Sequence, residues 1–342
     1  MSLPFAAPVA WCLVAAALFG ASTPVARALL DGIGPLTLAG LFYLGAALGT
    51  APWALTGHAP AARRREDVPR LLAAVLFGGV IGPVLVLLGL RAAPAASVAL
   101  WLNLEAPATA ILGWAFFREH VDRRTWAAAA LVWAASVLLA SPEGFGAWHA
   151  ALLVAGGCFA WGLDNNLTAV IAGYTPAQTT FVKGLGAGIF NLSLGIILEG
   201  VPAVSPSLGV AILVGMLSYG ASIVLYVAGA QQLGATRAQM FFATAPFLGV
   251  GFAWLLLGEP VLAAQIGAGA LMVGALTLLF GDRHAHAHTH EPMLHTHWHR
   301  HDDGHHAHGH DAVKGWHCHR HHHSELAHEH AHRPDLHHRH GH

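Results

Sequence analysis

Charged residues are scarce in this sequence. Asp, Glu, Lys and Arg together make up 10% of the 342 residues, whereas soluble domains contain about 25%. Hydrophobic residues account for 55% of the chain, and its mean hydropathy is +0.53. A water-soluble protein of this composition would have too few polar residues to cover its surface. The composition therefore predicts a multi-spanning membrane protein.

Basic charge, paired cysteines and nucleotide-binding motifs are also missing. The net charge of −1 gives no basic face for nucleic acid. The three cysteines, Cys12, Cys158 and Cys318, are odd in number and two of them lie in apolar runs, so no structural disulfide is expected. No segment matches the ATP-binding pattern G-x-x-x-x-G-K-[ST]. We expect no enzymatic activity and no required cofactor, and any work that the protein does would be driven by a gradient, with protons in exchange, instead of by ATP.

Apolar runs separated by Gly, Pro and Arg predict ten membrane spans. A bilayer core of about 30 Å requires roughly 20 apolar residues per helix. The N-terminus lacks a charged segment before its first apolar run, so that run is expected to be a retained span. The predicted spans are 8–30, 35–57, 69–91, 93–117, 124–141, 147–172, 176–198, 207–231, 235–257 and 261–281. The fold class is an all-α membrane protein followed by a tail.

Arginine clusters give the orientation of these spans. Arg63, Arg64, Arg65 and Arg70 follow the second span, and Arg118 follows the fourth. The connections on the other side carry few basic residues. Because cytoplasmic loops are enriched in Lys and Arg, both termini are predicted to be cytoplasmic and the protein to lie in the cell (inner) membrane.

The first 282 residues contain an internal repeat with an offset near 140. Its halves are 1–141 and 142–282, and residues 283–342 form the tail. The matched pairs include Phe19-Gly20 with Trp161-Gly162, Gly34-Pro35 with Thr175-Pro176, and Pro107 with Pro246. Each half holds five spans, which is an odd number, so the second half enters the membrane from the opposite side. This arrangement predicts two inverted five-helix repeats with a site between them.

The end of each half carries a recurring pattern. An apolar helix with a central Pro and a closing Glu precedes a span of small residues, over Asn103–Glu119 and Trp126–Ala140, and again over Phe242–Glu259 and Ile266–Phe280. This pattern resembles the EamA family of the drug/metabolite transporter superfamily, over about residues 8–281. The resemblance implies a ten-helix carrier that moves small solutes by alternating access and commonly exports them.

The sequence departs from that family at one position. Many relatives carry an Arg in the second span of a repeat, whereas this chain has Leu41-Phe42-Tyr43 in the first copy and Val182-Lys183-Gly184 in the second. Glu119 and Glu259, which close the fourth and ninth spans, are expected to be structural because helix ends accept charge at low cost. Tyr219 and Tyr226 share one helix face and are interpreted as packing residues.

Polar residues inside the spans are candidates for substrate binding or coupling, because an ionised group at the bilayer centre costs at least about 2.5–3.5 kcal/mol. The candidates are Glu105, Asp164, Asn165, Asn166 and Lys183. With a helix rise of about 1.5 Å per residue, Asp164 and Lys183 fall at similar depths on adjacent spans and are predicted to form an ion pair. Glu105 is expected nearer the midplane.

The roles of these residues remain open at this stage. The pair either fixes helix packing, or belongs to an oxygen-rich cation or proton site in which Lys183 competes with the substrate. For an anionic substrate, Lys183 would be the anchor. Pro107 and Pro246 are expected to bend their helices and to loosen backbone carbonyls near the cavity.

The tail holds every histidine except His58, His120 and His149. Imidazole suits Zn, Cu, Ni and Co. The segment has too few apolar residues to bury a core, so it is predicted to be disordered without metal. Its candidate ligands are His284, His286, His288, His290, His295, His297, His299, His301, His305, His306, His308, His310, His317, Cys318, His319, His321, His322 and His323.

These features together predict an exporter of divalent transition metal ions such as Ni or Co, whose tail collects or senses the ion. One alternative is an exporter of small organic metabolites, amino acids or drugs, with Lys183 holding a carboxylate and the tail acting as a metal buffer or pH-responsive segment. Another is a membrane-anchored metal sensor or storage protein that transports nothing. Membrane lipid and a small solute or metal ion are the expected partners, and homodimer formation is left open.

Overall fold

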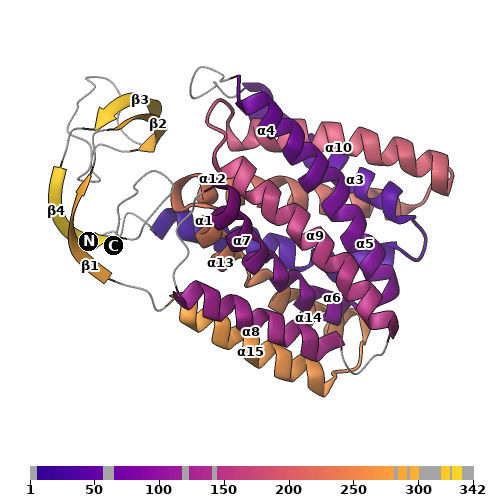
Figure 1. The fold of residues 1–342 in the computed structure, drawn as a ribbon. Coiled ribbons are helices and arrows are strands. Elements are labelled where there is room, and N and C mark those ends of the chain that lie inside the picture. The colour runs from indigo at the N-terminus through magenta and orange to yellow at the C-terminus, as the bar shows by residue number, and fades with distance from the viewer. Residues whose placement is uncertain are drawn as a thin grey trace.

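The computed structural model describes residues 6–56, 65–117, 123–140, 145–280, 284–290, 293–299, 317–323 and 326–332. Helices fill the part before residue 281 (Figure 1). The first half contains α1 (Ala6–Gly20), α2 (Ser22–Leu29), α3 (Pro35–Thr56), α4 (Asp67–Ala74), η1 (Val75–Ile81), α5 (Gly82–Ala92), α6 (Ala95–Trp101), η2 (Leu102–Leu104), α7 (Glu105–Phe117) and α8 (Arg123–Ala140). The second half contains α9 (Phe145–Ala169), α10 (Pro176–Glu199), α11 (Pro206–Val214), η3 (Gly215–Ala221), α12 (Ser222–Leu233), α13 (Ala235–Phe242), α14 (Ala245–Leu257) and α15 (Ala263–Phe280).

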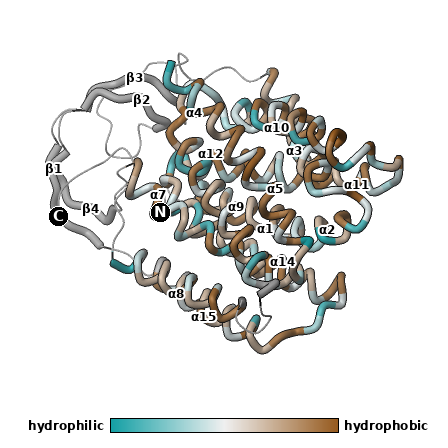
Figure 2. Tube along the Cα trace, turned by 45° about the vertical axis from the view of Figure 1, so that its right-hand side comes forward, coloured by the Kyte–Doolittle hydropathy of each residue, from teal (hydrophilic) through white to brown (hydrophobic). Residues whose placement is uncertain are grey.

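Several of these helices are long and apolar enough to cross a membrane, which confirms a helical, multi-pass membrane protein. Figure 2 shows hydrophobic residues along much of their length. Among the described residues, length and composition give seven candidate spans: Ala7–Leu29, Pro35–Thr56, Asp67–Ala92, Ala95–Phe117, Pro176–Glu199, Pro206–Leu233 and Ala235–Leu257. Three of the ten predicted spans are not among the seven. Those over 124–141 and 261–281 correspond to shorter apolar helices, and the span over 147–172 corresponds to α9, which contains the polar run 164–166.

The internal repeat is visible in the element boundaries. The two π-helical segments, η1 and η3, begin at Val75 and Gly215, a displacement of 140 residues. The starts of α7 and α14, at Glu105 and Ala245, show the same displacement. Packing follows the repeat as well: α1 packs on α12 and its counterpart α9 on α5, while α8 lies beside its own counterpart α15 (Figure 1).

Helices α3 and α10 form the central contact between the halves, and they run antiparallel. Gln178, near the start of α10, donates a hydrogen bond of 3.4 Å to the carbonyl of Ala54, near the end of α3. At the opposite ends, Gly195 lies against Thr37. Glycines allow this close approach, because a Cβ added at Gly184 would lie 2.7 Å from the backbone nitrogen of Ala47.

Two carboxylates from the second half cap helices of the first half. Glu259 accepts hydrogen bonds from the backbone nitrogens of Ala95 and Ala96 at 2.7 and 2.9 Å, at the start of α6. Glu199, at the end of α10, accepts from the backbone nitrogens of Leu36 and Thr37, both at 2.9 Å, and from the Thr37 hydroxyl at 2.8 Å. The structure thus gives Glu259 the structural role that was expected, and Glu119 lies outside the described residues.

Replacing Glu259 with alanine is expected to lower the free energy of unfolding by about 1.5–3 kcal/mol, because two backbone donors lose a charged acceptor. Thermal unfolding in detergent micelles measures the change. Asp31→Ala is the matched control, since Asp31 is exposed and its pairing with Arg27, one turn away, is worth little. Equal shifts for the two variants would contradict the capping role.

The described part of the tail contains four strands. Strand β1 (His284–His290) pairs antiparallel with β4 (Leu326–His332), and β2 (Met293–His299) pairs antiparallel with β3 (His317–His323). In these segments the structure differs from the disordered tail predicted above. The physical reason is that alternation of His with other residues has the two-residue period of a strand. Isolated two-stranded ladders are marginally stable in water, so these pairings do not amount to a packed domain.

Candidate functional site

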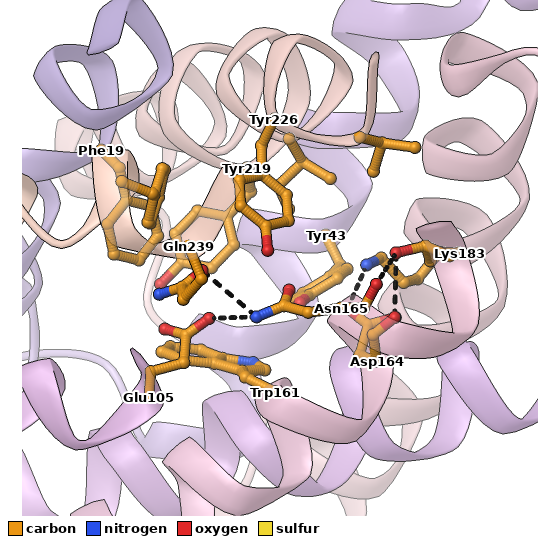
Figure 3. Close-up of a pocket in the computed structure, with 14 residues that line it drawn as sticks. Phe19, Tyr43, Glu105, Trp161, Asp164, Asn165, Lys183, Tyr219, Tyr226 and Gln239 are labelled. Carbon is orange, nitrogen blue, oxygen red and sulfur yellow. Dashed lines mark hydrogen bonds and ion pairs between the residues drawn. The ribbon is translucent and has the colours of Figure 1, made fainter. Parts of the chain in front are cut away.

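A cavity lies between the two halves of the helical body (Figure 3). Both halves contribute to it, through α1, α3 and α7 on one side and α9, α10, η3, α12 and α13 on the other. Its lining combines aromatic rings with a few charged and amide side chains. The lining residues are Phe19, Tyr43, Glu105, Trp161, Asp164, Asn165, Thr168, Lys183, Tyr219, Ile223, Tyr226, Val227, Gln239 and Phe242.

The predicted ion pair is present at one end of this cavity, and the prediction of its formation is confirmed. The Nζ atom of Lys183 lies 2.6 Å from Oδ2 of Asp164 (Figure 3). Lys183 is 2% exposed and Asp164 is 6% exposed. The second oxygen of Asp164, Oδ1, is buried and accepts no hydrogen bond from the described residues. Each charge therefore depends on the other for its compensation.

The π-helical segment η1 positions the surroundings of this pair. A π turn leaves backbone carbonyls without their usual helical donors, and here the carbonyl of Gly78 accepts hydrogen bonds from the Tyr43 hydroxyl and from Nε1 of Trp161, the latter at 3.0 Å. The Asp164 carboxylate packs directly against Gly78. A Cβ at this position would overlap the carboxylate oxygens, so only glycine fits here. One residue of η1 thus orients two aromatic rings and makes room for the acid.

A second polar cluster surrounds the side chain of Asn165. Its Nδ2 atom lies 2.8 Å from Oε1 of Glu105, 3.2 Å from Oγ1 of Thr109 and 3.3 Å from Oε1 of Gln239. Glu105 is 7% exposed. Within the part of the chain that the structure describes, none of the ion pairs involves its carboxylate. The cluster is therefore rich in oxygen and contains an acid without a cationic partner.

Asn166 lies elsewhere. Its Nδ2 atom donates to the carbonyls of Thr109 and Gly162, at 3.0 and 2.8 Å, and it does not line the cavity. Asn166 therefore holds α9 against α7. The other four predicted residues, Glu105, Asp164, Asn165 and Lys183, all line the cavity.

Both predicted helix-bending prolines lie in the first turn of a half-helix. Pro107 is the third residue of α7, which follows the 3₁₀ segment η2, and Pro246 is the second residue of α14, which follows the turn at Ala243–Thr244. Proline is tolerated there because its missing N–H would have no helical acceptor. The interruptions in the fourth and ninth segments therefore precede the prolines.

A smaller cavity lies beside these interruptions. It shares Phe19, Glu105, Gln239 and Phe242 with the larger cavity, and the break between α1 and α2 contributes Gly20. Glu105 and Gln239 thus line both cavities. The two cavities meet near the interruptions in the first, fourth and ninth predicted spans.

Sequence inspection did not find the aromatic wall or two members of the Asn165 cluster. Tyr219 and Tyr226, interpreted as packing residues, do contact other rings, such as Phe19 at 5.5 Å from Tyr219 and Phe242 at 5.2 Å from Tyr226, but they also line the cavity. Thr109 and Gln239 are ordinary polar residues within apolar runs. The one available signal was that each is a rare hydrogen-bonding side chain in a predicted span.

Among the described residues, no group of three or more His, Cys, Asp or Glu side chains is placed to hold a metal ion. In the tail, the ligands predicted over 284–299 and 317–323 lie on β1, β2 and β3, whose backbone alone is described. The remaining predicted ligands lie outside the described residues, and they are His301, His305, His306, His308 and His310.

Comparisons with known proteins agree with the repeated architecture. An uncharacterized transporter from Methanothermobacter thermautotrophicus is 26% identical over 234 residues, which cover 66% of this chain and 68% of that protein. A solved crystal structure superposes with a TM-score of 0.64 at 19% identity, covering 80% of this chain and 98% of the other, and shows the same fold. The EamA-like transporter family matches twice, over residues 7–141 and 148–281. The chain therefore belongs to the EamA-like transporter family, with one family unit in each half.

Proposed function

We propose that this transporter is a secondary carrier that exports small organic solutes through the cavity between its two halves. The observation that carries the proposal is the cavity itself, which is lined by both repeats and contains buried charged and amide groups among aromatic rings. Repeat transporters bind their solutes at such an interface. One chain supplies the whole lining, so the proposal requires no second copy.

We further propose that the protein has ten spans in two inverted repeats. It would lie in the inner membrane of the cell, with both termini in the cytoplasm. The antiparallel course of α3 and α10, which correspond to each other in the two repeats, supports the inversion. Alternating access then consists of rocking one repeat against the other. Exporters of this kind would take solute from the cytoplasmic side and release it outside.

The lining favours an organic solute over the Ni or Co ion predicted from the tail. Divalent transition metals are held by several imidazole, thiolate or carboxylate ligands, and the described residues offer no such group. Aromatic walls with a few polar groups are typical of sites for small organic molecules. We propose that the tail binds Ni, Co, Zn or Cu as an accessory buffer or sensor.

Glu105 is the proposed site of proton coupling. Its carboxylate is buried and has no cationic partner in the described chain, and burying a lone charge is costly. A bound proton would neutralise the carboxylate, and the cationic group of a solute would compensate its charge. Exchange of the one for the other would couple solute export to proton entry.

Flux measurements in proteoliposomes test the function. We expect uptake of organic amines or amino acids that depends on a proton gradient and persists after removal of residues 284–342. Flux of Ni, Co or Zn that survives the same truncation would overturn the organic substrate and restore metal export. Absence of all flux from folded protein would favour a sensor or storage role and overturn the carrier.

A further inference from the structure

The amide of Asn165 sits in a position suited to a different chemical group. Three oxygen atoms approach its Nδ2 atom within 3.3 Å, one each from Glu105, Thr109 and Gln239. These oxygens come from both repeats, since α7 carries the first two and α13 carries the third. An amide nitrogen has only two hydrogens, so it cannot serve all three acceptors at once. One acceptor is also a carboxylate, which a neutral amide does not neutralise.

A primary ammonium group matches the same position on both counts. It has three donors on one atom and carries a positive charge. Hydrogen bonds from a charged donor to a carboxylate are roughly twice as strong as neutral ones. The group would also supply the counter-charge that buried Glu105 lacks among the described residues.

We propose that Glu105, Thr109 and Gln239 form the binding subsite for the primary ammonium group of the exported solute. Asn165 occupies the subsite in this structure, and its side chain turns aside when the solute enters. The inference rests on the proposed carrier function and names the chemical class of its substrate, a primary amine with an apolar body.

The neighbouring surfaces fit the rest of such a molecule. Trp161, Tyr219 and Phe242 line the same cavity as Glu105, and Figure 3 shows Trp161 next to Glu105 and Asn165. Rings of this kind bury an apolar body and attract a nearby cation through their faces. Hard divalent cations would instead take six or more oxygen ligands, which three side chains do not supply.

Binding to the full-length protein in nanodiscs, measured by calorimetry, tests the subsite. The probes are phenethylamine, its N,N,N-trimethyl derivative and 2-phenylethanol, which share one apolar body and differ in the head group. We expect phenethylamine to bind at least about tenfold more tightly than the other two, because only its head group donates three hydrogen bonds. Equal affinity for the trimethyl derivative would overturn the subsite, since an aromatic wall alone would then account for cation binding.

Variants locate the effect. Thr109→Val keeps the shape of the side chain and removes one acceptor, and it is expected to weaken phenethylamine binding about tenfold while leaving the trimethyl derivative unaffected. Thr50→Val is the matched control, because the Thr50 hydroxyl is also buried but bonds the Ala46 carbonyl away from the cavity. Unchanged phenethylamine binding in folded Thr109→Val protein would overturn the assignment.

The inference and the carrier function fail separately. Flux of neutral or acidic organic solutes, with no binding of phenethylamine, would overturn the ammonium subsite and leave the carrier intact. A folded protein that transports no organic solute would overturn both. Displacement of phenethylamine by sodium ions, at constant ionic strength, would assign the three oxygens to a coupling ion and overturn the solute subsite.

Discussion

Lys183→Ala is expected to destabilise the folded protein by about 3–5 kcal/mol, because it leaves the Asp164 carboxylate buried without a cation. The fraction of folded protein after mild heating, followed by size-exclusion chromatography in detergent, measures the loss. Asp164→Ala is expected to have an effect of similar size, since it leaves the buried ammonium unpaired.

The double variant is the decisive control for this pair. Lys183→Met combined with Asp164→Leu removes both charges and fills the space with apolar atoms, which often restores stability at buried ion pairs. We expect the double variant to be more stable than either single charge removal. Its matched single variants are Lys183→Met and Asp164→Leu, and a double variant as unstable as the sum of their effects would contradict mutual compensation. If it folds and still exports solute, the pair serves helix packing alone.

Gly78→Ala is expected to destabilise the protein by about 3 kcal/mol, the upper end for inserting a methyl group into a packed interior. Its Cβ would overlap the carboxylate of Asp164, which Lys183 holds in place. Relief requires η1 to move or the ion pair to open. A shift of η1 would also disturb the hydrogen bonds that Tyr43 and Trp161 donate to the Gly78 carbonyl.

Two comparisons separate this overlap from a general effect of alanine. Gly209→Ala, in α11, adds a methyl group where nothing lies within 4 Å, and it is expected to stabilise the helix slightly. In the second comparison, Asp164→Ala is combined with Gly78→Ala, and the cost of the glycine substitution should largely disappear. A cost that remains the same in both backgrounds would show that the carboxylate is not the group the methyl meets.

The sequence allowed much of the fold to be predicted because its signals are local. Runs of apolar residues predicted helices close to their observed bounds, such as 35–57 for α3. The offset of the repeat was also readable from pairs of residues. The π-helical form of η1 and η3 was not predicted, because it depends on side chains from other helices, such as Tyr43, bonding the freed carbonyls. The paired strands in the tail depend likewise on partners far along the chain.

The candidate site was partly predictable for the same reason. Asp164 and Lys183 stood out as charges in apolar runs, and their spacing across a short connection gave the ion pair. Asn166 shared the signal of Asn165, but its side chain bonds backbone carbonyls and does not line the cavity, because adjacent residues of a helix face different directions. The aromatic wall comes from segments up to 223 positions apart, Phe19 and Phe242 being in contact at 5.4 Å. No pattern along the chain marks such rings as neighbours.

Glu199 and Glu259 form hydrogen bonds that any separation of the two halves would have to break. Both belong to the second half, and both hold the starts of helices in the first half, α3 and α6. Parting the halves along that edge means releasing these backbone donors in a single movement. Solvent can take over each of the broken hydrogen bonds, so the net free energy required is far smaller than the number of bonds suggests. The two carboxylates therefore link the halves through contacts that can be released at a modest net free energy.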